Sequence, residues 1–380
     1  MTDNVYTRSG IGMPTSVNES ARSVMVRNTD GKGFVFTVDD KKRLTRFLIL
    51  GTEKGTYYAG EKPLTKESVT FLVELIKRDR QMVIDTVKEI STSGRAYHNS
   101  QAIFVVAVIA VHGWEPNTHQ GQTETITDLV LAVCRTSTHL FEFADYLEML
   151  GGWSRTKCTA VARWYTSKSV DELAYQVVKY RQRNGRTHRD MLRLSHPSLS
   201  DLDSNIAKFI LGKDTNTAAA THDMPRIIEG FRFAQEAQTS SELINLALTD
   251  YPQLPWEAIP TQFHKDLKVW QKLFDNGQIK GQALLRNITR FARLGAFDDM
   301  VFAHKYNSAL VDEDMMRRTR LHPFQYLLAM NVHSQGQAVR GNHVPGYAYG
   351  RTKDWTTSPI IMDALDDGFN KAFRYVEPAG

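Results

Sequence analysis

The chain has 380 residues, and 47 lysines and arginines against 42 aspartates and glutamates give a formal net charge of +5. Hydrophobic residues make up 42% and charged residues 23%, which is typical of globular proteins and excludes wholesale disorder, a collagen-like repeat and a disulfide scaffold. Cys134 and Cys158 form no CxxC pair, so we expect reduced thiols in a soluble, cytoplasmic protein.

The first 33 residues differ from the rest of the chain. They are rich in Thr, Ser, Asn and Gly and show no periodicity, which predicts a flexible N-terminal arm over 1–33. They are also too polar for a signal peptide. A short strand is expected over 34–38, and helical patterns then continue to residue 375, which predicts one helical domain over 34–375.

The helical patterns begin after Asp39 and Asp40, which are expected to cap a helix over 41–50. A clearer helix is expected over 65–80, with Thr65 as its N-cap. The longest apolar run, 102–113, is shorter than the roughly 18–20 residues of a membrane span and predicts a buried core helix. Further patterns follow, ending with a helix over 360–375.

The connections between these helices are short and contain Gly, Pro, Asn and Ser. Alternation of period two and a βαβ rhythm are both nearly absent, so the sequence predicts an all-α fold. Many short helices joined by brief turns are typical of an α-solenoid of stacked helix pairs. No fixed repeat period is visible, which indicates divergent repeats.

Motifs of nucleotide, hydrolase and metal chemistry are missing. The sequence contains no GxxxxGK[ST], no strand–GxGxxG–helix unit, no GxSxG and no HExxH. Its twelve histidines show no metal-ligand spacing. We therefore expect no enzymatic activity, no cofactor and no metal.

The most informative local feature is the segment 179–196, KYRQRNGRTHRDMLRLSH, which we call the basic cluster. A helix over 171–183 would place Lys179 and Arg183 on one exposed face, with Asn184-Gly185 as its C-terminal stop. Thr187 is expected to cap a second helix with Asp190 as its capping-box partner. That helix would align Arg189, Arg193 and His196 at i, i+4 and i+7.

Like charges at i, i+4 destabilise a helix, so two such stripes indicate a polyanionic ligand rather than a solvated face. Tyr180 and the histidines can stack or donate hydrogen bonds, which favours irregular RNA over duplex DNA read by a helix-turn-helix. The candidate RNA-binding residues are Lys179, Arg181, Arg183, Arg186, His188, Arg189, Arg193 and His196.

Three weaker basic segments remain open as alternatives. The first contains Arg135, Thr138 and His139, with Thr138 expected as an N-cap; in the second, Trp153 and Trp164 are expected in the core near Arg155, Lys157 and Arg163. The third is a long loop, 335–358, whose mixture of basic and aromatic residues is typical of single-strand binders. These loop residues are Arg340, Tyr347, Tyr349, Arg351, Lys353 and Trp355.

Six stretches spread along the chain resemble the TROVE module of the Ro autoantigen family, ring-shaped proteins that bind Y RNAs, and we identify the chain as a bacterial or phage member. The stretches are RLTRFLILGTEKGTYY (43–58), VCRTSTHLFEF (133–143), VKYRQRNGRTHRDMLRLSHP (178–197), ALLRNITRF (283–291), RLHPFQYLLAM (320–330) and ALDDGFNKAFRYVEPAG (364–380). The resemblance implies a ring of HEAT-like helix pairs. It also implies a Y RNA or Y-like small RNA on the outer surface, at Lys179, Arg183 and His196.

The resemblance further implies that single-stranded ends of misfolded RNA enter a central hole, and that an exoribonuclease such as polynucleotide phosphorylase is a partner. Family members continue into a von Willebrand factor A-like domain with a DxSxS metal site, which bridges the two ends of the ring. This sequence ends at Gly380 and contains no DxSxS, so we expect residues 376–380 to begin the linker to an absent domain. Whether the helices form a ring or an open horseshoe is left open.

We therefore expect a non-catalytic RNA-binding protein that scaffolds a small structured RNA for RNA quality control or degradation. One alternative is a helical-repeat scaffold whose basic face binds an acidic protein. Another is a nuclease or other RNA-processing enzyme.

Overall fold

The computed structural model describes residues 25–27, 34–36, 38–50, 66–113, 125–198, 202–213, 224–336 and 355–376. In these ranges nearly all regular structure is helical, apart from two small two-stranded sheets. The expected all-α helical-repeat fold is confirmed.

The first sheet lies at the N-terminus. Strand β1 (Met25–Arg27) pairs antiparallel with β2 (Phe34–Phe36), with Val26 opposite Val35. The expected strand is confirmed over 34–36, while β1 adds a strand to the stretch that was expected to be an arm. The rest of that stretch lies outside the described residues.

The first half of the chain forms eight consecutive helices in the described ranges. They are α2 (Asp40–Leu50), α3 (Lys66–Arg78), α4 (Arg80–Ser93), α5 (Ser100–His112), α6 (Ile126–Val133), α7 (Ser137–Leu150), α8 (Arg155–Thr166) and α9 (Val170–Lys179). Helix α5 is buried from Gln101 to Ala110, as its apolar sequence predicts, because α3, α4, α6 and α7 pack around it.

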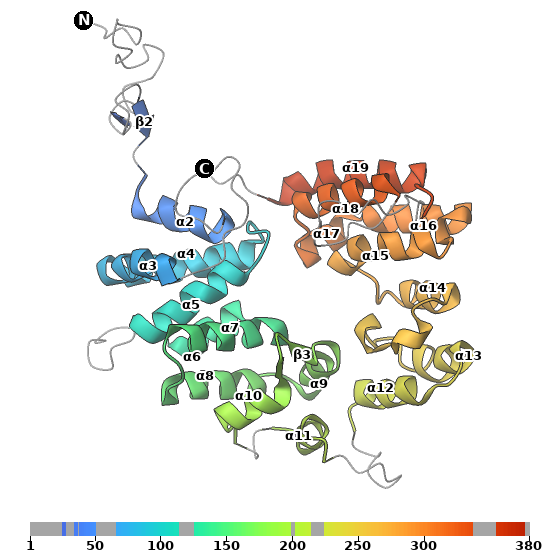
Figure 1. Cartoon of the computed structure of the whole chain (residues 1–380), viewed down its shortest axis with the longest axis horizontal. Helices are drawn as coiled ribbons and strands as arrows, with labels where there is room; N and C mark the ends of the chain where they lie inside the picture. The colour runs from blue at the N-terminus through green and yellow to red at the C-terminus, as the bar shows by residue number, and fades with distance from the viewer. Residues whose placement is uncertain are drawn as a thin grey trace, which may run out of the picture.

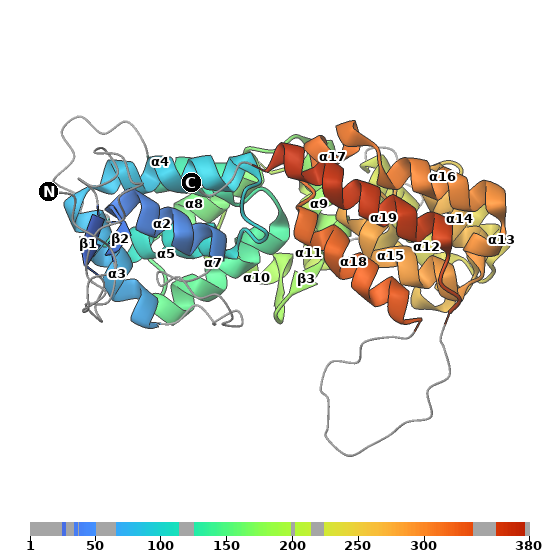
Figure 2. The same cartoon turned by 90° about the horizontal axis from the view of Figure 1, so that it is seen from above.

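A short hairpin and two helices follow. Strands β3 (Gln182–Arg183) and β4 (Arg186–Thr187) pair antiparallel and lead into α10 (His188–Ser195) and then α11 (Ser204–Leu211). The hairpin lies between α7 and α10 (Figures 1 and 2).

The second half continues with α12 (Arg226–Glu236), α13 (Ser240–Glu242), a π-helical stretch (Leu243–Leu248), α14 (Leu267–Asp275), α15 (Gln282–Arg293), α16 (Met300–Leu310), α17 (Glu313–Thr319), α18 (Pro323–Gln335) and α19 (Pro359–Ala372). Short 3₁₀ turns occupy Trp256–Ala258, Thr261–Phe263, Ala296–Asp298 and Phe373–Tyr375. Interlocking aromatic rings fill the core between these helices, with Phe291 in contact with Trp270, Phe302 and Tyr306.

The helices follow one another around a ring whose two ends meet (Figures 1 and 2). The ring of Tyr97, between α4 and α5, lies edge-on 5.1 Å from that of Phe324 at the start of α18. Gly94, at the end of α4, lies so close to Arg320 that a Cβ added to this glycine would be 3.1 Å from the Cβ of Arg320. We call this junction of residues 92–99 with residues 317–325 the seam.

None of the helices in the described ranges is long and apolar enough to cross a membrane. The same ranges contain no group of three or more His, Cys, Asp or Glu side chains that would hold a metal ion.

Candidate nucleic-acid interface

The basic cluster contains a tight hairpin instead of a continuous helix. Helix α9 ends at Lys179, and the chain then reverses at Asn184 and Gly185, whose φ angles of 51° and 80° are both in the left-handed region. An Asn-Gly pair in this conformation is typical of two-residue β-hairpin turns. The prediction of a helix through Arg183 was therefore wrong, and Lys179 and Arg183 do not share a helix face.

The hairpin is anchored on α7 by polar contacts. Arg186 forms ion pairs with Asp145 and Glu148, and Asn184 Nδ2 donates to Asp145 Oδ2 at 3.1 Å. Burial opposes the charge of Arg186, but the two carboxylates outweigh it and raise the pKa of its guanidinium. Because this charge is compensated inside the protein, Arg186 contributes little positive potential at the surface.

The start of α10 confirms the predicted capping box. Asp190 N donates to Thr187 Oγ1 at 3.3 Å, and Thr187 N donates to Asp190 Oδ2 at 2.9 Å. The bond from the Thr187 hydroxyl holds the pKa of Asp190 below its usual value. Helix α10 ends at Ser195, so His196 is a C-cap residue with a left-handed φ of 46° and does not continue the Arg189–Arg193 stripe.

His188 belongs to the core, contrary to its assignment as an RNA contact. Its side chain is only 3% exposed, with Nδ1 2.8 Å from Tyr165 Oη and Nε2 3.1 Å from the carbonyl oxygen of Tyr180. Burial lowers the pKa of this imidazole to about 4. His188 is therefore a core residue and no exposed RNA contact, although its side chain also lines the cavity beside Arg189.

Lys179 is half-buried at the end of α9. Its Nζ donates to Tyr175 Oη at 3.1 Å and lies 5.4 Å from the ring centre of Tyr180. Burial opposes the charge, but Tyr180 and Glu257 outweigh it and raise the pKa of this ammonium group. Lys179 is therefore charged at neutral pH and partly accessible.

Arg181 and Arg189 line a cavity of about 510 Å³ between the hairpin, α10, α11 and α12. The guanidinium of Arg181 lies 4.9 Å from the ring centre of Phe231. Arg189 Nη2 donates at 2.5 Å to the carbonyl oxygen of Leu211, the last residue of α11. Both cations thus stabilise the packing of neighbouring helices while their exposed side chains line the cavity.

Five of the eight candidate residues are exposed, namely Arg181, Arg183, Arg189, Arg193 and His196. Neither Arg183 nor Arg193 forms an ion pair with any carboxylate that the structure describes, although Asp190 lies close enough to Arg193 to feel its charge. Six of the eight candidates are therefore accessible cations or imidazoles: these five exposed groups and the half-buried Lys179.

Two of the weaker predictions need correction. Thr136, and not Thr138, caps α7, because its Oγ1 accepts from His139 N at 3.4 Å. Trp355 is buried and donates to the carbonyl oxygen of His333 at 3.1 Å, so it is a core residue and no stacking platform. The other loop residues named above, Arg340, Tyr347, Tyr349, Arg351 and Lys353, lie outside the described ranges.

The second basic segment is also largely structural. Trp164 is fully buried, as expected, and Trp153 is half-buried against the core. Lys157 is buried and donates to the carbonyl oxygen of Gly152 at 2.8 Å, while Arg155 and Arg163 are exposed.

One basic site is visible only in the folded chain, because its residues come from distant parts of the sequence. Arg135, from the α6–α7 connection, shares a cavity of about 340 Å³ at the seam with three arginines of the second half of the chain, Arg286, Arg318 and Arg320. These residues lie far apart in sequence, so charge density along the chain could not bring them together. The only local signals are the basic run Arg317–Arg320 and the position of Arg135 in one of the weaker basic segments.

Residues 27–236 and 252–352 match the TROVE domain family. The chain is 34% identical over 357 residues to RNA-binding protein RO60 of Deinococcus radiodurans, which covers 93% of this chain and 63% of that protein. It is 28% identical over 432 residues to RNA-binding protein RO60 of Caenorhabditis elegans, which covers 95% of this chain and 65% of that protein.

The fold is similar to the crystal structure of the Deinococcus radiodurans RO (RSR) protein, with a TM-score of 0.67 and 31% sequence identity over 90% of this chain and 65% of that chain. The chain thus spans just under two thirds of the length of these relatives. A match over most of the sequence, together with a shared helical architecture, leads to one conclusion. The chain belongs to the TROVE domain family.

Proposed function

We propose that the chain binds a small structured RNA of the Y RNA type without catalysing a reaction on it. The observation that carries this proposal is the exposed part of the basic cluster. Arg183, Arg193 and His196 lie there beside the half-buried Lys179, together with Arg181 and Arg189 at the neighbouring cavity. This surface lies within the part of the chain that matches relatives named RNA-binding proteins.

The chemistry of these side chains fits an RNA backbone. Arg183 and Arg193 present guanidinium groups that pair with phosphate oxygens, and such contacts position a nucleic acid without reading its sequence. His196 ends α10 and is exposed, so its imidazole is placed to donate a hydrogen bond or stack on an unpaired base. The surface therefore suits an irregular stem-loop better than a uniform duplex.

The wider proposal places the helical domain over 34–375 in RNA quality control in the cytoplasm. Single-stranded ends of misfolded RNA would enter the centre of the ring, and an exoribonuclease such as polynucleotide phosphorylase would act on them. This part is supported by the family membership and by the ring arrangement of the helices.

The test is filter binding of a Y-like stem-loop RNA and a duplex DNA of equal length at several salt concentrations. The variant Arg183→Gln/Arg193→Gln removes two exposed charges, and Arg46→Gln on α2 is the matched control, since Arg46 is also exposed. We expect the double variant to bind the RNA more weakly. The slope of log K against log salt should become shallower by about one to two, the contribution of two phosphate contacts.

Three outcomes would count against the proposal. Unchanged RNA affinity in the double variant would make the basic cluster a solvated surface. Equal binding of RNA and duplex DNA would remove the preference for structured RNA. Cleavage of the RNA during the incubation, with or without Mg²⁺, would contradict the absence of catalysis.

A further inference from the structure

The seam contains polar and basic residues that have no role in the proposed RNA surface. On one side are residues that belong to the first half of the chain, Asn99 and Arg135 among them. On the other side are Arg318 and Arg320 of the α17–α18 region. A cavity built from both ends of the ring can be complete only when the two ends are in contact.

The cavity at the seam is a concentrated site of positive charge. It is lined by four arginines and two histidines and by no aspartate or glutamate, and Asn99, Gln282 and Gln325 add amide groups. The full basic set is His98, Arg135, His139, Arg286, Arg318 and Arg320. Glu257 interacts electrostatically with Arg286 but does not line the cavity. Such a lining matches an anion that accepts several charge-assisted hydrogen bonds.

Arg135 is held rigidly toward this space. Its Nη1 donates to Ser91 Oγ at 2.8 Å, and Ser91 Oγ donates to Asn99 Oδ1 at 2.7 Å. Burial and the charge of Arg320 lower the pKa of Arg135 to about 10, so Arg135 remains charged at neutral pH and is repelled by Arg320 across the seam. A phosphate between them would replace this repulsion with attraction on both sides.

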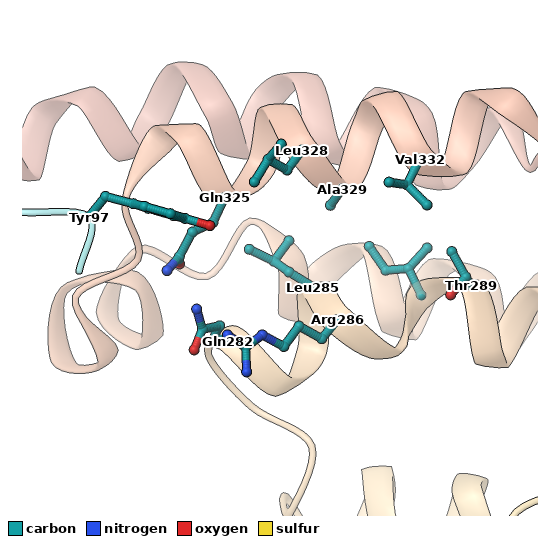
Figure 3. A pocket seen from close by; sticks show the side chains of 10 residues that line it. Tyr97, Gln282, Leu285, Arg286, Thr289, Gln325, Leu328, Ala329 and Val332 are labelled. Carbon is teal, nitrogen blue, oxygen red and sulfur yellow. The ribbon is translucent and has the colours of Figure 1, made fainter. Parts of the chain in front are cut away.

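A second, apolar space adjoins the first. It measures about 210 Å³ and lies between α15 and α18, where Leu285, Leu328, Ala329 and Val332 point into it (Figure 3). Tyr97 of the opposite end of the ring closes one end, next to Gln282, Gln325 and Arg286. These last four residues line both spaces, so the anion cavity and the apolar slot are adjacent.

The slot has the size and chemistry for one planar base. Its volume is below the roughly 300–1,000 Å³ typical of pockets for drug-sized ligands. Aromatic and aliphatic side chains such as Tyr97 and Leu328 offer stacking surfaces. The amide of Gln282 at the end of the slot can donate to or accept from the polar edge of a base.

We propose that the seam is a nucleotide site, with the phosphate bound by Arg135 from one end of the ring and by Arg286 and Arg318 from the other, and the base in the slot beside Tyr97. The ligand class is a nucleoside monophosphate group, either free or at the end of an RNA chain. The site is separate from the basic cluster and stands whether or not that cluster binds RNA. Because the ligand contacts both ends, its binding stabilises the closed ring.

The test is isothermal titration of the full chain with uridine 5′-monophosphate, adenosine 5′-monophosphate, inorganic phosphate and uridine. We expect both monophosphates to bind more tightly than phosphate or uridine alone. Arg286→Gln/Arg318→Gln should weaken monophosphate binding at least about tenfold, since two charge-assisted contacts are lost. Tyr97→Leu should weaken monophosphate binding several-fold more than it weakens phosphate binding, because the stacking surface for the base is lost. Arg46→Gln is the control for loss of one exposed arginine.

Two sets of ligands distinguish a free nucleotide from the end of an RNA chain. Free monophosphates that bind identify a nucleotide ligand, whereas binding only of 5′-phosphorylated oligouridine, and not of its 5′-hydroxyl form, identifies the end of an RNA chain. A second readout is hydrogen exchange, which should slow over residues 92–99 and 317–325 when uridine 5′-monophosphate or the phosphorylated oligonucleotide binds.

The proposal is overturned if none of the phosphorylated ligands binds, or if Arg286→Gln/Arg318→Gln binds them as tightly as the wild type. It is also overturned if inorganic phosphate binds as tightly as the monophosphates, because the slot would then contribute nothing. Failure of Arg183→Gln/Arg193→Gln to weaken Y-like RNA would leave these results untouched, so the two proposals fail independently.

Discussion

The basic cluster and the seam contain similar numbers of cations, yet they present them differently. In the basic cluster, Arg186 is compensated by Asp145 and Glu148, and Arg189 stabilises the end of α11. At the seam, Arg286 and Arg318 point with Arg135 toward one cavity whose lining contains no acid. In a segment with many charges, folding thus pairs some of them with carboxylates or packs them against neighbouring helices. Arginines that are far apart in sequence instead come together at one site.

The largest expected effect distinguishes the buried residues of the basic cluster from its exposed residues. His188→Ala should lower the free energy of unfolding by about 3–4 kcal/mol, because it leaves a cavity and deprives the buried Tyr165 hydroxyl of its partner. Arg193→Ala, on the exposed face of the same helix, should change it by less than about 0.5 kcal/mol. Urea unfolding at pH 7 measures both, and equal losses would contradict the burial of His188.

The next effect concerns pH. In the folded chain, burial lowers the pKa of His188 to about 4, and the same holds for His333 and for His139 beside Arg135. The unfolded chain therefore binds protons first, near the usual value of about 6.5. The contribution of each imidazole to stability is complete above pH 6.5 and is lost as pH falls toward 4, up to about 3 kcal/mol for His188.

The change with pH in the difference in unfolding free energy between the wild type and His188→Ala reports the titration of His188 alone. The difference should narrow as the pH falls from 7 to 4, and a constant difference would show that His188 is not held neutral. Carboxylates with a lowered pKa, such as Asp190, act in the same direction but at lower pH.

The smallest expected effect comes from a substitution that disturbs the packing of the seam and leaves its charged residues in place. Gly94 has a φ of 78°, and an added Cβ would lie 3.1 Å from the Cβ of Arg320. Gly185 in the hairpin has a φ of 80°, but an added Cβ would meet nothing within 4 Å. Both alanine substitutions incur the left-handed penalty of about 1–2 kcal/mol, and only Gly94→Ala also disturbs the seam.

We expect Gly94→Ala to be the more destabilising of the two and to speed hydrogen exchange over residues 317–325. Gly185→Ala should leave exchange at the seam unchanged. Equal exchange in both variants would mean that the contact of Gly94 with Arg320 does not hold the two ends together.

The predictions that succeeded depend on neighbours along the chain. The helices, the capping box of Thr187 and Asp190 and the buried run of α5 follow from spacing and from local hydrogen bonds. The prediction that failed inside the basic cluster also had a local signal, since Asn184-Gly185 is typical of a hairpin turn as well as of a helix stop. Choosing between them depended on the anchoring of Arg186 on α7, a contact across 41 residues.

The sequence by itself determined an all-α repeat protein of the TROVE family with a basic segment over 179–196, because helix periodicity, caps and charge runs are properties of adjacent residues. Only the tertiary structure decided which of those charges are exposed, that His188 is a core residue, and that Arg135 meets Arg318 and Arg320 at the seam. The physical reason is that contact between the two ends of the ring depends on the packing angles of all helix pairs between residues 99 and 317 together. No short stretch of sequence determines all of these angles.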